Sequence, residues 1–282
     1  STSLHSYWTN SMGFKRAGIS EQTKDPSNES YYGRDEDGNL NGFISEQEAF
    51  NPIKNAIIND IGNSTILQNS VNVLEDYAKN GNTSIVSMGL TTDDPNVIRL
   101  YHHLSSKNSS IINKLFEIIG LLPSRKPTVR HFIYSRYDSP HLLPSSVENG
   151  DDFFKFLGIK FWYDGSPYTG TMYMEDHYMD NELTNHRLHF PHSHSGAPLL
   201  VDDEFKTAIK AYEAAGWQIA VHTQGDKAIH DVLDIFESVG KSDRLLRHRL
   251  EHCLMLDSEN ILKMKQLNIH PSFHINHIYY YG

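Results

Sequence analysis

The amino-acid sequence predicts an α/β fold, a barrel built from parallel strands. Helical patterns alternate with short β-branched runs from residue 64 onward, an order typical of parallel sheets whose faces are covered by helices. None of the predicted strands is followed by the glycine-rich phosphate turn that a doubly wound sheet usually carries. Polar residues gather where the strands end, as they do at the mouth of barrel enzymes. A (β/α) barrel is therefore the better prediction.

Residues 1–63 are polar and rich in Asn, Ser, Glu and Gly, which predicts turns with a short hairpin rather than a core. Regular structure is expected from Ser64, where an N-cap, helical apolar spacing and a stop at Gly81 predict a helix. Six strands are predicted after it: Thr83–Met88, Val129–Tyr134, Ile159–Tyr163, Gln218–His222, Arg247–Glu251 and Ile269–Phe273. The helices predicted between them are Pro95–Leu104, Asp151–Leu157, Asp203–Ala215, Lys227–Val239 and Ser258–Leu267.

The composition of the 282 residues excludes some classes of partner. Acidic residues outnumber basic ones by 35 to 25, for a net charge of −10. This balance disfavours nucleic acid, because phosphate binding needs clustered Lys and Arg. No apolar run approaches the roughly 20 residues of a transmembrane helix, so no membrane partner is expected. The one cysteine, Cys253, excludes an internal disulfide. The sequence does not distinguish a cytoplasmic from a periplasmic location. A homo-oligomer is also compatible with it.

Two histidines stand at the ends of neighbouring predicted strands. His222 is the last residue of one strand and precedes a turn that contains Asp226, while His252 ends the next strand directly after Glu251. They lie thirty residues apart in sequence, yet the carboxyl ends of parallel strands meet at one edge. Imidazole suits Zn²⁺ and similar ions. A single strand-end histidine is more often a hydrogen-bonded core residue, so the metal and core interpretations both stay open here.

Lys160 lies between Ile159 and Phe161 in a predicted strand, with Asp164 just beyond that strand. A lysine in such a stretch is ordinarily a surface residue whose stem lies along apolar neighbours. On an inner strand its ammonium would be costly to bury without a partner.

Other histidines and the cysteine offer weaker candidates. His192 and His194 form an HxH pattern with His186 and His189 nearby, but the flanking Pro and Gly predict a loop that captures metal adventitiously. His274 and His277 follow the last predicted strand, and either face the mouth or are ordinary polar loop residues. His102 and His103 are expected on a helix surface. Cys253 is expected in the core, because adjacent strand residues point to opposite faces.

Three segments in this order resemble one family: GIKFWYDGSPYTGTM, QIAVHTQGDKAIHDVLDIFE and RHRLEHC. They are similar to the YtcJ-like branch of the amidohydrolase superfamily, which includes N-substituted formamide deformylases. HSYWTNSMGFKRAGI and GRDEDGNLNGF are similar to the stretch that precedes the second barrel strand there. The resemblance therefore runs along essentially the whole chain. It implies a distorted (β/α)₈ TIM-type barrel and hydrolysis of an amide, formamide or cyclic amide C–N bond by metal-activated water.

The resemblance also implies roles for individual residues. Lys160 matches the strand-four lysine, which in such enzymes can be carboxylated and bridge metals, and His222 and His252 match the ligands from strands five and six. One or two divalent ions are implied, with zinc the first expectation. Asp164, Asp226 and Glu251 are expected to buttress the site, and His5 to contact a small-molecule amide substrate. Residues 1–63 are expected near the mouth between strands one and two, and residues 64–282 to supply strands two to seven.

Two parts of the family pattern are missing from the sequence. The HxH pair of the first strand is absent, and so is the last-strand aspartate that binds metal and serves as general base, which is expected beyond residue 282. We therefore expect a fragment without the first and last barrel strands and the flanking β-domain, inactive by itself. The alternative is a regulatory or binding protein on the same barrel, because some relatives carry an exoenzyme-regulatory label.

Overall fold

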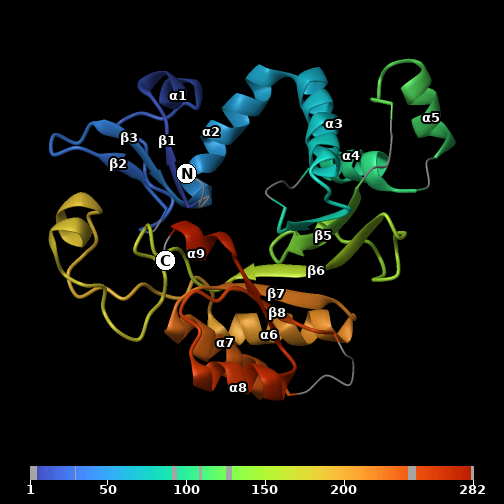
Figure 1. Ribbon diagram of the computed structural model, residues 1–282. Helices are drawn as coiled ribbons and strands as arrows, with labels where there is room; N and C mark the ends of the chain where they lie inside the picture. The colour runs from blue at the N-terminus through green and yellow to red at the C-terminus, as the bar shows by residue number, and fades with distance from the viewer. Residues whose placement is uncertain are drawn as a thin grey trace. The chain divides into compact units, whose positions relative to one another are not determined.

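The computed structural model describes residues 5–28, 30–90, 94–107, 110–124, 129–240 and 246–280 (Figure 1). The chain divides into two compact units. One consists of residues 1–63 and 164–198, and the other of residues 64–163 and 199–282. Each unit has a sheet of its own.

The first unit contains a three-stranded antiparallel sheet in the order β1-β3-β2. Its elements are β1 (Ser6–Trp8), α1 (Ser11–Arg16), β2 (Tyr32–Arg34), β3 (Leu40–Ser45) and α2 (Glu46–Ile61). The β2–β3 turn is held by the Asp35 carboxylate, which accepts the backbone N–H groups of Asp37 and Asn39 at 3.1 and 2.8 Å. The predicted hairpin is thus confirmed. A π-helical turn, η2 (Glu182–Arg187), belongs to the 164–198 segment of this unit.

The first unit has a core that the sequence analysis did not predict. Its buried members come from five elements and the segments between them: Tyr7, Phe14, Ile19, Tyr32, Ile44, Ala49 and Ile53. The expectation that residues 1–63 lack a core, and that regular structure begins at Ser64, is therefore wrong. The physical reason is that these apolar residues come singly or in pairs on separate elements, so no long apolar run marks them before they pack.

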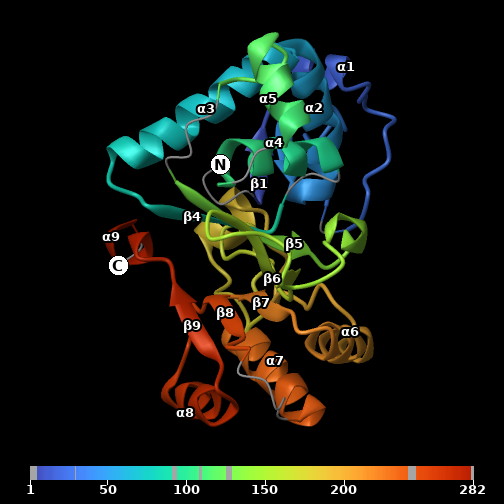
Figure 2. The same cartoon turned by 90° about the vertical axis from the view of Figure 1, so that its right-hand side faces the viewer.

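The second unit is built on a six-stranded parallel sheet in the order β4-β5-β6-β7-β8-β9. The strands are β4 (Ser84–Met88), β5 (Arg130–Arg136), β6 (Phe154–Trp162), β7 (Gln218–Thr223), β8 (Arg249–His252) and β9 (His270–Phe273). All six predicted strands are confirmed, in sequence order across the sheet. The sheet curls as part of a barrel wall does (Figure 2).

Helices alternate with most strands of this sheet. Helix α3 (Asn63–Lys79) precedes β4, and α9 (Asn276–Tyr280) follows β9. Between the strands lie α4 (Pro95–Ser105), α5 (Ile111–Ile118), α6 (Asp202–Ala214), α7 (Asp226–Val239) and α8 (Ser258–Leu267), while a 3₁₀ turn, η1 (Pro140–Leu142), lies between β5 and β6. Local signals set their starts: Asp94, Ser110 and Asp257 each cap a helix through the side-chain oxygen. The predicted helices after β4, β6, β7 and β8 are confirmed, while α5 and α9 were not predicted.

Helices α6, α7 and α8 lie together along one face of the sheet (Figures 1 and 2). Aromatic rings join the two layers. Phe161 of β6 lies 5.0 Å from Phe205 of α6, and Phe205 lies 6.4 Å from Phe236 of α7, as ring-centroid distances. Because strand side chains alternate between faces, Lys160 points to the opposite, concave face from Phe161.

The predicted helix Asp151–Leu157 is wrong. The Asp151 carboxylate accepts the backbone N–H groups of Phe153 and Phe154 at 2.8 and 2.9 Å, which makes a turn. Strand β6 then begins at Phe154, and Phe154 and Phe156 are buried whereas Lys155 is only partly so. This period-two burial fits a strand, so pairing with β5 overrides the local helical tendency.

Candidate metal site at the ends of the strands

His222 and His252 lie side by side at the carboxyl ends of β7 and β8. Their ring centroids are 4.6 Å apart, with an interplanar angle of 65°. The two strands are parallel neighbours, with Thr223 opposite His252 in register. The expectation that separate strand ends bring these imidazoles together agrees with this geometry.

His222 is buried and held on both sides of its strand. Its carbonyl accepts the backbone N–H of Tyr163 at 3.0 Å, and it stands in register opposite Trp162 of β6 and Glu251 of β8. Its Nε2 lies 3.4 Å from Nε2 of Gln224, two residues further along. These contacts fix the backbone of His222 within the sheet and place an amide next to its ring.

His252 is set by an unusual backbone. Its φ is 74° and that of Cys253 is 48°, both in the left-handed region that costs a non-glycine residue energy and often marks functional sites. The chain therefore turns sharply where β8 ends. Cys253 is buried, as predicted, and its thiol lies 3.4 Å from the Leu250 carbonyl. Burial raises the pKa of this thiol to about 12, and the charge of Glu251 adds to the rise, so Cys253 is no thiolate nucleophile.

Lys160 is buried on the concave face of β6, with 2% of its surface exposed. The surface-lysine interpretation is therefore wrong. Its Nζ lies 5.5 Å from the centroid of the Trp162 ring, and Lys160 stands opposite Ala220 in register. Trp162 in turn stands opposite His222, so the three functional candidates come from three neighbouring strands.

Glu251 is paired with Arg249 rather than with either histidine. Arg249 donates to both carboxylate oxygens, through Nε at 2.7 Å and Nη2 at 3.1 Å, and Nη2 also donates to Ser272 Oγ at 2.9 Å. Burial works against the charge of Arg249, but the hydrogen bonds and the charge of Glu251, together with Tyr134, outweigh it, so the pKa of Arg249 is raised. The sequence analysis missed Arg249, although a spacing of two puts it on the same strand face as Glu251.

The two aspartates of the predicted outer layer lie in different settings. Asp226 is the first residue of α7, and its carboxylate accepts the N–H of Lys227 at 2.8 Å. It follows β7 closely, as expected. Asp164 is fully buried and belongs to the first unit, where its carboxylate accepts the N–H of Tyr173 at 3.1 Å.

His5 also belongs to the first unit, where Nδ1 lies 2.8 Å from Oε2 of Glu46. Glu46 is the first residue of α2. The sequence analysis assigned no role to Glu46, because a glutamate at a helix start is ordinarily explained by the helix dipole.

The weaker histidine candidates separate into distinct cases. His274, just after β9, lies 6.5 Å from His252 between ring centroids. His192 pairs with Asp180 at 3.2 Å, and His194 Nε2 lies 2.5 Å from the Gly170 carbonyl, in a stretch without helix or strand, as predicted.

His103 is buried, so its predicted surface position is wrong. Its ring is drawn inward by the Pro123 carbonyl, 3.1 Å from Nε2. His277 lies on α9, and its side chain is outside the described part of the structure.

Within the described residues, no group of three or more His, Cys, Asp and Glu side chains is arranged to hold a metal ion. A metal site built on the paired imidazoles would need at least one further ligand, and Lys160 is the nearest candidate by strand order.

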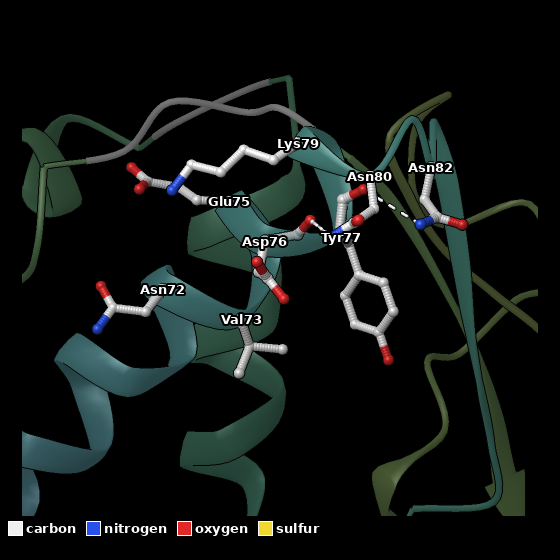
Figure 3. Close-up of a pocket in the computed structure, with 8 residues that line it drawn as sticks. All are labelled: Asn72, Val73, Glu75, Asp76, Tyr77, Lys79, Asn80 and Asn82. Carbon is white, nitrogen blue, oxygen red and sulfur yellow. Dashed lines mark hydrogen bonds between the residues drawn. The ribbon is translucent and has the colours of Figure 1, made fainter.

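A surface depression of about 740 Å³ lies elsewhere, over the end of α3 and the turn that follows it (Figure 3). It is lined by Asn72, Val73, Glu75, Asp76, Tyr77, Lys79, Asn80 and Asn82. This turn leads into the amino end of β4, whereas His222 and His252 stand at carboxyl ends. In a parallel sheet the amino ends and the carboxyl ends of the strands lie on opposite sides, so the depression is not part of the histidine site.

Comparison with known proteins places the chain. The family model described as "Amidohydrolase family" matches residues 1–282. The chain belongs to this family. The fold agrees with two solved structures of uncharacterised metal-dependent hydrolases. That from Pyrococcus horikoshii has a TM-score of 0.61 at 18% identity and that from Pyrococcus furiosus 0.60 at 20%.

These matches cover 97% and 98% of the chain but only 47% and 49% of the solved structures. Protein LONG AFTER FAR-RED 3 of Arabidopsis thaliana is 25% identical over 201 residues, which is 68% of the chain and 32% of that protein. The chain thus spans about a third to a half of the relatives it matches. No helix in the described ranges is long and apolar enough to cross a membrane.

Proposed function

We propose that the chain is the ligand-bearing part of a metal-dependent amidohydrolase of the YtcJ-like branch. The reaction is hydrolysis of an amide, formamide or cyclic amide C–N bond. The observation that carries the proposal is the His222–His252 pair, 4.6 Å apart at adjacent strand ends, with Lys160 buried on the next strand. The metal-dependent hydrolases of similar fold support it.

The residues present fit a divalent metal, zinc first. Two imidazoles and an oxygen ligand are a common zinc set, and a carboxylated Lys160 would supply that oxygen. Carboxylation also converts a buried ammonium into an anionic oxygen ligand, so that no cation is buried at this position. When bound, the metal would supply an activated water for attack on the substrate carbon.

The remaining residues prepare this site. Gln224 lies at the His222 ring, and Arg249 neutralises Glu251, so the Glu251 carboxylate does not compete with the imidazoles for a cation. Asp226 buttresses the site from the start of α7, directly after β7, whereas Asp164 and His5 belong to the first unit.

The proposal includes barrel closure by two further strands. In the described part of the sheet, β4 and β9 each pair with one neighbour, and Phe273 of β9 is 64% exposed. The six strands would be strands two to seven of a (β/α)₈ barrel, and the general base would lie outside this chain. We expect the chain alone to show no turnover of N-substituted formamides.

A binding or regulatory protein on the same fold is the second candidate. It is favoured by the absence of a complete three-ligand group among the described residues. This candidate predicts no bound metal, whereas the hydrolase proposal predicts that the chain binds a metal ion through His222 and His252.

Metal content decides between the two candidates. After removal of any affinity tag and dialysis against a weak chelator, elemental analysis should find about one zinc per chain, as a three-ligand site would hold. His222→Asn and His252→Asn should each abolish binding. His192→Asn is the matched control, because this exposed histidine pairs with Asp180 and should leave the metal content unchanged. Metal at background level in the unaltered chain would favour the binding protein.

A further inference from the structure

Gly89 directly follows β4, and its backbone is fixed there. Its φ is 92°, in the region that a residue with a side chain rarely adopts. Its N–H donates to the carbonyl of Ser87 at 3.1 Å and to that of Tyr134 on β5 at 3.2 Å. Gly89 therefore stands at the carboxyl end of its strand, the end of the sheet that carries the candidate metal site.

The space beside Gly89 is filled by two side chains of β6. A Cβ added to Gly89 would overlap Cη2 of the Trp162 ring, and would lie 2.9 Å from Cζ2 of that ring and 3.0 Å from Cγ of Lys160. Carbon atoms in favourable contact are about 3.5–4.0 Å apart, so a side chain at residue 89 would displace both. Strand β5 lies between β4 and β6, so Trp162 and Lys160 reach past β5 to the end of β4.

The Trp162 ring also lies against the charged end of Lys160. The Lys160 Nζ is 5.5 Å from the ring centroid, and the guanidinium carbon of Arg136 is 5.8 Å from it. A cation at this distance is attracted by the electrons of an indole face. Arg136 is itself held, because its Nε donates to Oδ1 of Asp138 at 2.8 Å. The stem of Lys160 thus lies against Gly89 and its amine lies near the ring.

We propose that Gly89 and Trp162 are positioning residues for Lys160. The missing side chain at residue 89 admits the indole ring, and the glycine and the ring together confine the lysine side chain on the concave face. The role of Lys160 as a metal ligand rests on the proposed function, whereas the confinement of its side chain does not.

Confinement is measured without metal by competitive lysine labelling. The chain, stripped of metal and kept in buffer free of carbon dioxide, is treated with acetic anhydride, and each lysine is quantified by peptide mass spectrometry. Lys155 is the internal reference, because it lies on the same strand with a side chain that is 33% exposed. We expect Lys160 to be labelled about tenfold or more slowly than Lys155, since labelling then needs a local opening.

Gly89→Ala should remove most of this protection, because the added methyl group displaces the indole ring and the lysine stem. Gly81→Ala is the matched control. Its φ is 83°, and nothing lies within 4 Å of a Cβ added there, so it carries the same backbone strain without the overlap. We expect Gly81→Ala to protect Lys160 as well as the unaltered chain does.

Trp162→Phe tests the same contact without changing a glycine. A phenyl ring lacks the two ring atoms that meet residue 89, so Lys160 should lose protection. Combining Gly89→Ala with Trp162→Phe should add nothing to the effect of Trp162→Phe alone, because the methyl group then occupies the space that the indole left. Such non-additivity is expected of residues in contact and not of two separate disturbances of the fold.

Zinc binding extends the test to the proposed metal site. By equilibrium dialysis, Gly89→Ala and Trp162→Phe should each weaken zinc binding by about 10- to 100-fold, the usual effect of losing a residue that orients a ligand. Gly81→Ala should bind zinc as the unaltered chain does.

Three results would overturn the proposal: labelling of Lys160 as fast as Lys155 in the unaltered chain, full protection of Lys160 in Trp162→Phe, or additive losses in the double variant. A chain that binds no zinc, yet shows the protection and its loss in Gly89→Ala, would overturn the metal site and retain the role of Gly89 and Trp162.

Discussion

His131 shows how one buried side chain couples folding to pH. It lies on β5 with 3% of its surface exposed, its Nε2 is 2.8 Å from Ser87 Oγ, and its ring centroid is 4.8 Å from that of Tyr101. Burial lowers the pKa of His131 to about 4. The unfolded chain, where histidine keeps its ordinary pKa of about 6.5, therefore takes up the proton first. The contribution of neutral His131 to the free energy of unfolding is fully present above a pH of about 6.5 and is lost as the pH falls toward about 4.

We expect the free energy of unfolding to drop by about 3 kcal/mol across this window through His131 alone. Urea unfolding at about pH 7 and about pH 4.5 measures it. His131→Asn removes the titrating group and should flatten this part of the pH dependence. The control is His230→Asn, since His230 is exposed on α7 and lies 3.3 Å from Asp234. An unchanged slope in His131→Asn would contradict the assignment.

Residues at the ends of strands could be placed from the sequence, whereas residues within the layers could not. His222 and His252 end two predicted strands, and the parallel order alone brings the carboxyl ends of such strands together. His103 and His131 carry no such mark, because their burial depends on what packs across from them. Glu46 was missed for the same reason, since its partner His5 is 41 positions away.

Strand β8 carries the Arg249–Glu251 ion pair next to His252 of the candidate metal site. Glu251 is 8% exposed in its side chain and Arg249 is 31% exposed, so removal of one partner leaves a charge with little solvent. We expect Arg249→Met to destabilise the chain by about 3 kcal/mol, because an uncompensated carboxylate is costly to bury. Chemical denaturation measures the loss. Arg249→Met combined with Glu251→Leu should recover most of it, since no charge then stays buried.

The control for this cycle is an ion pair at the surface. Lys263 of α8 pairs with Asp234 and, at 3.1 Å, with Glu237. Lys263→Met should cost less than about 1 kcal/mol, because exposed pairs contribute little. A double variant of β8 that is no more stable than Arg249→Met would show that the pair acts through packing instead of charge.

Helices with a clear apolar periodicity were predictable from the sequence, whereas segments whose structure depends on pairing or packing with other segments were not. Helices α6, α7 and α8 have clear caps or stops and long apolar periods, and they were predicted within a residue or two. The first half of β6 was assigned to a helix, because Phe154 and Phe156 become a strand face only when paired with β5. Of the three-stranded sheet only the β2–β3 hairpin was predicted, and the core of this unit was missed because it is assembled from separate segments.

At the scale of the molecule, the parallel sheet has two edges that differ from its interior. The inner strands are covered on both sides by neighbours, whereas β4 and β9 each have one neighbour in the described structure. Val86 of β4 is 43% exposed and Phe273 of β9 is 64% exposed, and Ile275 just beyond is 78% exposed. An edge strand with open backbone groups and apolar side chains is a template for pairing with another chain.

We expect the chain to self-associate through the β9 edge, and Phe273→Lys to suppress this association, because a lysine on an edge opposes strand pairing. Sedimentation velocity over a range of concentrations measures the effect. Ile118→Lys is the control: Ile118 is 82% exposed on α5, where a helix satisfies its own backbone groups and offers no edge. If Ile118→Lys dissolved the oligomer and Phe273→Lys left it intact, apolar surface on α5 would be responsible. The β9 edge would then not be open for pairing in solution. The argument for further barrel strands beside β9 would lose its support.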